Sequence, residues 1–107
     1  MLIIKFRSGG LVNKAHIDIE VFTSSLCSNC QRASFVVGQL LEETEFESVT
    51  WSEVDVVAEI DYAVALGVLA TPAIAIGGEL VFSALPSKQQ LRDAIHHYLS
   101  RRRSIDE

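Results

Sequence analysis

Alternation of apolar and charged side chains marks the first regular element of the chain. Within residues 15–23, the carboxylates Asp18 and Glu20 alternate with β-branched side chains at every second position. Successive side chains of a β-strand point to opposite faces of a sheet, so this pattern predicts a strand with one buried face. Residues 48–57 are predicted to form a second strand on their content of β-branched and aromatic side chains.

The spacing of apolar residues changes after Cys27. From there they recur three and four residues apart, which is the spacing of one helix face: Cys30, Ala33, Val36, Val37, Leu40 and Leu41. This predicts an amphipathic helix from Cys27 that ends near Glu43. A shorter helix is predicted from about Glu59 to Leu66, with Gly67 at the left-handed position that commonly ends a helix.

The C-terminal half is predicted to form a hairpin followed by a helix. Residues 73–76 and 79–82 are predicted to be strands joined by a Gly-Gly turn. Ser87 and Gln90 have the spacing of a capping box, which opens a last helix. The apolar stripe of that helix consists of Leu91, Ala94, Ile95, Tyr98 and Leu99.

The order of these elements defines the fold class. Two strand–helix units followed by a hairpin predict an α/β fold, with a central mixed four-stranded sheet and helices on both faces. A chain of 107 residues is expected to form a single domain, residues 1–107. Residues 1–14 are interpreted as an N-terminal extension able to supply one extra strand, and residues 101–107 as a polar tail.

Composition and charge narrow the function classes. The net charge of −5 argues against nucleic acid or an anionic membrane as the partner. The sequence has no apolar run long enough to span a bilayer. The opening "MLIIKFR" has too few apolar residues before a charge for a signal-peptide core, so a cytoplasmic location is expected.

Cys27 and Cys30 are the two cysteines of the chain. In a reducing cytoplasm, a lone structural disulfide would be rare, so the CxxC spacing indicates chemistry or metal binding. On a helix, this spacing places the Cα atoms about 5–6 Å apart, within the range of a disulfide. Cys30 continues the buried stripe, whereas Cys27 precedes the first turn, where the helix dipole favours a thiolate. An exposed nucleophile beside a buried resolving thiol is what thiol–disulfide exchange requires.

A metal site and inert packing are the alternatives for this cysteine pair. A zinc site needs two more ligands, and the histidines of the chain are His16, His96 and His97. Adjacent side chains on a helix point about 100° apart, so His96 and His97 do not easily face one ion. The spacing of the cysteines favours redox chemistry and leaves the other two interpretations open.

A second motif adds a family resemblance. In "LGVLATPAIAI", Pro72 follows Thr71 and directly precedes a predicted strand, about forty residues beyond the CxxC. This order resembles the thioredoxin and glutaredoxin superfamily, in particular its small, glutaredoxin-sized thioredoxin-like proteins. Those proteins combine a strand–CxxC–helix unit with a "GV…TPA" segment, a Gly-Gly turn and a "PS" helix start. The resemblance extends from Ile17 to Leu99.

The resemblance implies a thioredoxin-like fold and a thiol–disulfide oxidoreductase with Cys27 and Cys30 as catalytic residues. It implies a cis peptide bond before Pro72 and a redox-active disulfide as the working group, with no further cofactor and no metal. The expected partners are a protein or small disulfide substrate and an electron-donating reductase. The expected substrate-binding residues are Thr71, Pro72, Leu26, Ser28 and Asn29.

The sequence also departs from the superfamily's patterns. Thioredoxins proper have Trp where Leu26 stands, Gly-Pro where Ser28 and Asn29 stand, and often a buried aspartate where Val21 stands. Glutaredoxins bind glutathione through a lysine upstream of the CxxC and a Gly-Gly-Asp segment after the hairpin. Here Ser24-Ser25 and "SALPS" occupy those places, which argues against glutathione. The rival functions are a non-catalytic partner-binding module and a soft-metal or metalloid carrier.

Overall fold

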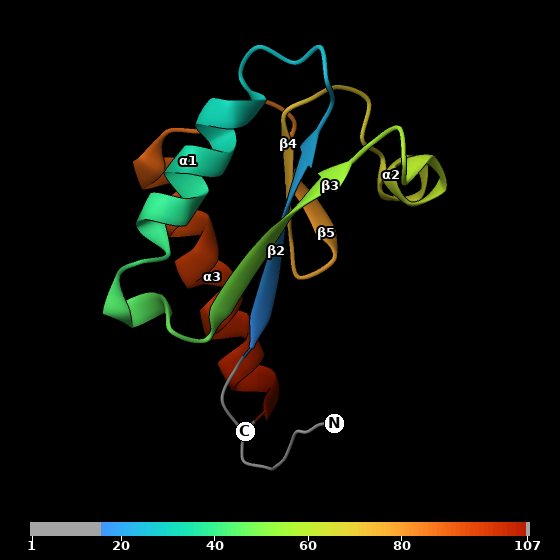
Figure 1. Cartoon of the computed structure of the whole chain (residues 1–107). Coiled ribbons are helices and arrows are strands. Elements are labelled where there is room, and N and C mark those ends of the chain that lie inside the picture. Colours follow the sequence, from blue (N-terminus) through green and yellow to red (C-terminus); the bar gives the residue numbers. More distant parts are fainter. Residues whose placement is uncertain (1–15, 107) are drawn as a thin grey trace, which may run out of the picture.

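A central sheet with helices on both faces forms the body of the protein (Figure 1). The computed structural model describes residues 16–106, with side chains described as far as residue 101. Its elements are β2 (Ile17–Thr23), α1 (Cys30–Leu40), the 3-10 helix η1 (Thr44–Phe46), β3 (Val49–Asp55), α2 (Ile60–Leu66), β4 (Ala73–Ile76), β5 (Glu79–Phe82) and α3 (Lys88–Asp106). No helix in this part of the chain is long and apolar enough to cross a membrane.

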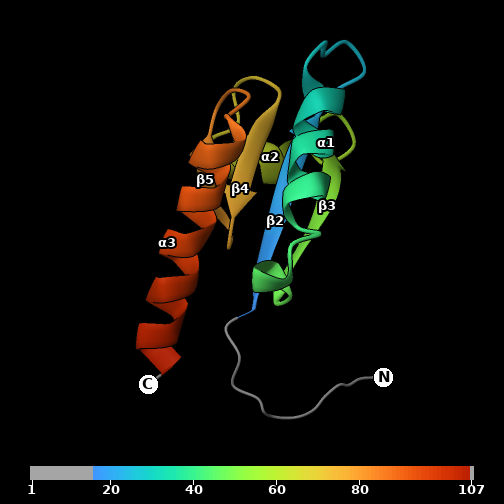
Figure 2. The same cartoon turned by 90° about the vertical axis from the view of Figure 1, so that its left-hand side faces the viewer.

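The sheet has the strand order β3-β2-β4-β5. β2 pairs in parallel with β3 and antiparallel with β4, and β4 pairs antiparallel with β5. Helices α1 and α3 cover one face, and α2 lies against the other, as the two views show (Figures 1 and 2). The predicted α/β fold with a mixed four-stranded sheet is therefore confirmed. The extra strand considered for residues 1–14 lies outside the described residues.

The two faces of the central strands form two different cores. On the face of α1 and α3, the core contains large aliphatic side chains, including Ile19, Val21 and Ile74. On the face of α2, Phe22 packs with alanines, namely Ala63, Ala73 and Ala75. Successive side chains of a strand alternate between faces, so neighbours such as Val21 and Phe22 serve different cores. Strand β4 is buried along its whole length because it is covered on both sides.

Polar contacts fix the outer elements to this frame. The Tyr62 hydroxyl of α2 donates a hydrogen bond to Glu20 of β2 at 2.5 Å. This bond, with a smaller effect of burial, raises the pKa of Tyr62 to about 12. On the other face, Arg92 of α3 donates to Glu43 at 2.5 and 3.0 Å and holds the pKa of that carboxyl below its usual value. The carboxylate of Glu20, one of the two on β2, therefore serves to dock α2.

Several predicted boundaries differ from the structure. Strand β3 covers Val49–Asp55, whereas residues 48–57 were predicted. Helix α1 begins at Cys30 and ends at Leu40, rather than running from Cys27 to near Glu43. Cys27 belongs to a loop, in which its N–H donates a hydrogen bond to the Ser24 carbonyl. The spacing of apolar residues cannot predict such a turn, because it is the same for a helix that begins at either cysteine. At the C-terminus, α3 continues to Asp106 through most of the expected polar tail. No Gly or Pro interrupts residues 101–106, and arginine is a good helix former.

The hairpin and the helix caps agree with the sequence. The strands 73–76 and 79–82 are found as predicted, and Gly67 adopts a left-handed conformation with φ 93° at the end of α2. The capping box is formed: the Gln90 N–H donates to the Ser87 hydroxyl at 3.1 Å, and the Ser87 N–H donates to the Gln90 side chain at 2.9 Å.

Removal of this cap gives a measurable prediction. Ser87→Ala should lower the free energy of unfolding by about 1 kcal/mol, because an N–H at the start of α3 loses its acceptor. Urea unfolding followed by circular dichroism measures the change. Ser100→Ala, an exposed site in the body of the same helix, is the matched control and should leave stability unchanged or slightly raised. Equal losses at both positions would contradict the capping role.

Candidate active site

The two cysteines lie at the carboxyl end of β2. Cys27 is in the loop that follows this strand, and Cys30 is the first residue of α1. Their sulfurs form a disulfide, with the Cα atoms 5.5 Å apart. The spacing of the CxxC therefore places the thiols within bonding distance, although the helix begins only at the second cysteine.

The two sulfurs have different surroundings. Cys30 is 5% exposed, whereas Cys27 is only partly buried. The Sγ atom of Cys30 lies 3.9 Å from the main-chain carbonyl oxygen of Phe22. The partial negative charge of this oxygen disfavours a thiolate beside it, and burial acts in the same direction. Once the disulfide is reduced, both effects favour the protonated form of Cys30.

The proline loop lies beside the cysteine loop. The peptide bond between Thr71 and Pro72 is cis, and the Pro72 side chain is buried. The hydroxyl groups of Thr71 and Ser24 are 3.1 Å apart and share a hydrogen bond across 47 residues of sequence. The structure therefore brings Thr71 and Pro72 to the loop that carries Cys27. The sequence indicated Thr71 but contained no signal for its contact with Ser24.

The other predicted substrate-binding residues lie on the surface of the same loop. Ser28 and Asn29 are exposed, and Leu26 is 96% exposed. Leu69, two residues before Thr71 in the proline loop, is 97% exposed and was missed by sequence reasoning. Nothing in the local sequence marks this leucine as exposed, and only the tertiary structure shows it in solvent. Two leucines, one in each loop, are therefore almost fully exposed.

No carboxylate of the described residues lies in the core beneath this site. Val21 is fully buried among aliphatic side chains, at the position where many thioredoxins carry aspartate. Within residues 16–101, Ser34 is the one buried polar side chain, and it donates its hydroxyl proton to Glu53. The part of the chain that the structure describes also contains no group of three or more His, Cys, Asp or Glu side chains placed to hold a metal ion.

Comparisons with known proteins identify the family. Residues 17–96 match the family model described as "Thioredoxin domain". A protein named "Probable Thioredoxin" from Methanothermobacter thermautotrophicus is 35% identical over 80 residues, which span 75% of this chain and 93% of that protein. A thioredoxin from Methanocaldococcus jannaschii is 33% identical over 79 residues, which span 74% of this chain and 92% of that protein.

A solved structure is similar to this chain in both fold and sequence. A mutant thioredoxin from Halobacterium salinarum NRC-1 matches with a TM-score of 0.67 at 26% identity, covering 81% of this chain and 78% of its own. Together with the bonded cysteines at the end of β2, these matches establish that the chain belongs to the thioredoxin family and is a thiol–disulfide oxidoreductase.

Proposed function

We propose that the protein reduces disulfides in protein substrates, with Cys27 as the attacking thiol and Cys30 as the resolving thiol. The observation that carries this assignment is the difference in exposure between the two sulfurs. An intermolecular attack needs a sulfur that a second protein can reach, and Cys27 is the more accessible one. The second attack is intramolecular, so a buried Cys30 can perform it.

The exchange proceeds in two balanced steps. The Cys27 thiolate attacks one sulfur of the substrate disulfide, which breaks, and the other substrate sulfur leaves as a thiolate. Cys30 loses its proton and attacks Cys27 Sγ, which forms the Cys27–Cys30 disulfide and releases the second substrate thiolate. Two electrons pass to the substrate. Because Val21 is apolar, the Cys30 proton goes to solvent or to the leaving thiolate rather than to an internal carboxylate.

Substrate binding is assigned to the two loops around the disulfide. Thr71 lies two residues before Ala73, the first residue of β4, and none of the loop hydrogen bonds in residues 16–106 uses its main-chain groups. Those groups can pair with an extended substrate segment beside Cys27, with Pro72 buried beneath them. Leu26 and Leu69 supply apolar contact area, and Ser28 and Asn29 supply polar contacts.

The electron donor is proposed to be a partner reductase that returns two electrons to the Cys27–Cys30 disulfide. The cysteine pair itself carries the electrons, so the proposed cycle uses no bound cofactor. Glutathione is a poorly suited donor, because serines stand where glutaredoxins place their upstream lysine and Ser24 is engaged with Thr71. The proposed compartment is the cytoplasm, where reducing conditions keep such a dithiol in its active form.

Alkylation of the reduced protein tests the assignment of the thiols. At about pH 6, limiting iodoacetamide should label Cys27 at least about tenfold faster than Cys30, because Cys27 is the more accessible sulfur and Cys30 is buried beside the Phe22 carbonyl oxygen, which favours its protonated form. Peptide mapping by mass spectrometry gives the two rates. The protein unfolded in urea is the control, in which both cysteines should react alike. Equal labelling in the folded protein, or faster labelling of Cys30, would rule out the proposed roles.

A turnover assay separates the proposal from its rival. A non-catalytic partner-binding module needs no reversible disulfide, whereas a reductase must cycle between dithiol and disulfide. With dithiothreitol as the electron source, the protein should accelerate the reduction of a peptide disulfide in a catalytic, concentration-dependent way. A protein that binds such a peptide without accelerating its reduction would be a binding module.

A further inference from the structure

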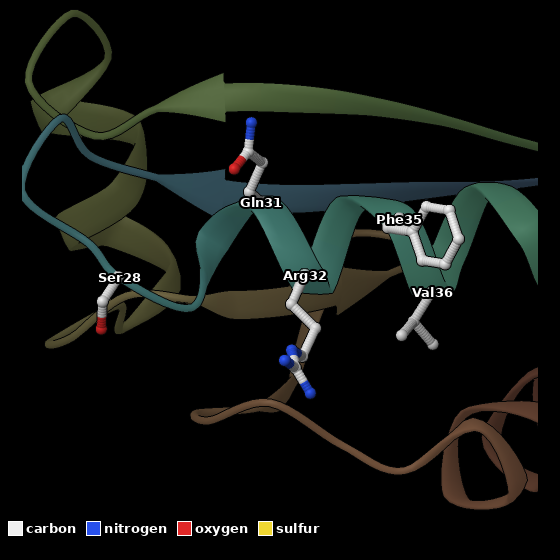
Figure 3. A pocket seen from close by; sticks show the side chains of 5 residues that line it. All are labelled: Ser28, Gln31, Arg32, Phe35 and Val36. Carbon is white, nitrogen blue, oxygen red and sulfur yellow. The ribbon is translucent and has the colours of Figure 1, made fainter.

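A groove runs from the active-site loop along the surface of α1. It has a volume of about 590 Å³ and is lined by Ser28, Gln31, Arg32, Phe35 and Val36 (Figure 3). Ser28 stands between the two cysteines, so the groove opens beside the disulfide. We propose that this groove binds a substrate segment with an acidic side chain, which Arg32 holds by an ion pair. The inference rests on the proposed role of Cys27 and adds a substrate class to it.

The side chains of the groove form a row that an extended peptide can follow. Arg32 and Val36 lie four residues apart on α1 and point to the same side, on which Ser28 of the preceding loop also lies (Figure 3). Four residues along a helix advance about 6 Å, and two residues along a strand advance about 6.6 Å. Alternate side chains of an extended substrate can therefore meet Arg32 and then Val36 in succession.

The charge of Arg32 is available for a ligand. Arg32 is exposed, and no acidic side chain of the described residues forms an ion pair with it. The other described lysine and arginine residues all lie on α3, where Arg92 is bonded to Glu43 and Arg101 lies 4.0 Å from Glu79. Among the described lysines and arginines, Arg32 is therefore the one outside α3, and it lines a groove that opens at the disulfide.

The occupant follows from this chemistry. A guanidinium group binds a carboxylate through two parallel N–H···O bonds, a geometry that lysine cannot offer. Phe35 is 62% exposed and, with Val36, gives the far end of the groove an apolar lining. The preferred segment is therefore a protein segment with Asp or Glu about two residues from the reacting cysteine and an apolar residue about two further on.

Peptide disulfides that differ in one charge test the proposal. Three synthetic peptides carry a cysteine as a neutral mixed disulfide with pyridine-2-thiol, and Glu, Gln or Lys two residues away, in sets placed on either side of the cysteine. Release of the thione by reduced protein gives the rate for each. At low ionic strength the Glu peptide should react about fivefold faster than the Lys peptide, and added salt should shrink this ratio.

Two variants connect the preference to the groove. Arg32→Glu should invert the ratio of Glu to Lys rates, and Arg32→Gln should bring it close to one. Arg101→Glu makes the same change in net charge at the far end of α3 and should leave the ratio as in the wild type. Because only ratios within each protein are compared, a general loss of activity in a variant does not affect the result.

The outcomes separate this inference from the proposed function. Wild-type protein that reduces all peptides at equal rates, or an Arg32→Glu variant that keeps the wild-type order, would overturn the inference and leave the reductase assignment intact. An inversion by Arg101→Glu would also overturn it, because net charge alone would then explain the preference. A protein that reduces none of the peptides would count against the proposed function itself.

Discussion

Cys30→Ser should accumulate as a mixed disulfide with its substrate, whereas Cys27→Ser should trap no substrate. In Cys30→Ser the accessible sulfur of Cys27 remains and attacks as before, but no second thiolate is present to release the product. In Cys27→Ser the remaining thiol is 5% exposed and lies beside the Phe22 carbonyl oxygen, so it is both inaccessible and favoured as the protonated form. Both variants should lose catalytic turnover.

Mass spectrometry of each variant mixed with a disulfide peptide measures trapping directly. The adduct of Cys30→Ser should approach one peptide per protein and disappear on addition of dithiothreitol. The double variant is the control for non-specific attachment and should give no adduct. A metal clip or a packing role would give no such asymmetry, because both sulfurs would then serve one purpose. Trapping by Cys27→Ser to the same extent would show that the roles are wrongly assigned.

Phe22→Ala should be among the most destabilising single substitutions in the protein. The Phe22 side chain is fully buried on the face of α2, with its ring centroid 5.9 Å from that of Tyr62. Its other neighbours include alanines, namely Ala63, Ala73 and Ala75, whose short side chains cannot move into the space. The loss combines the transfer free energy of the ring with a cavity, about 3–5 kcal/mol. A domain of ordinary stability has about 5–15 kcal/mol, so much of its margin would be lost.

Urea unfolding of the oxidised protein measures this change in the free energy of unfolding. Phe35→Ala is the matched control: the same side chain is removed from a position 62% exposed, and the change should stay within about 0.5 kcal/mol. Phe22→Leu keeps most of the volume and should cost less than about 1.5 kcal/mol, so it remains measurable if the alanine variant fails to fold. Similar losses for Phe22→Ala and Phe35→Ala would contradict the arrangement of the core.

Local periodicity was sufficient for most of the secondary structure. The strand at 73–76, the Gly-Gly turn and the strand at 79–82 agree residue by residue with the structure. The Ser87 cap and the end of α2 at Gly67 also agree. These features depend on side chains within a few residues of one another, and their physics can be read from the chain alone. The identity of the cysteine pair as redox chemistry likewise came from spacing and position.

The start of α1 and the length of α3 needed the tertiary structure. Apolar spacing is the same whether a helix begins at Cys27 or Cys30. In the structure, the Cys27 N–H bonds to the Ser24 carbonyl in a turn, and the first helical hydrogen bond runs from the Ala33 N–H to the Asn29 carbonyl. The exposure of Leu69 and the absence of an ion pair at Arg32 within the described residues are similar cases. Both depend on which residues other segments bring near, and composition does not contain that information.

The assembly of the site is the clearest case. Cys27 and Pro72 are far apart in sequence, yet β2 and β4 are antiparallel neighbours in which Phe22, one residue before the end of β2, pairs with Ala73 at the start of β4. Antiparallel pairing places the carboxyl end of one strand beside the amino end of its neighbour. The loop after β2 and the loop before β4 therefore meet, and Ser24 bonds to Thr71. The sequence by itself determined the two motifs, and the pairing of the strands decided that they form one site.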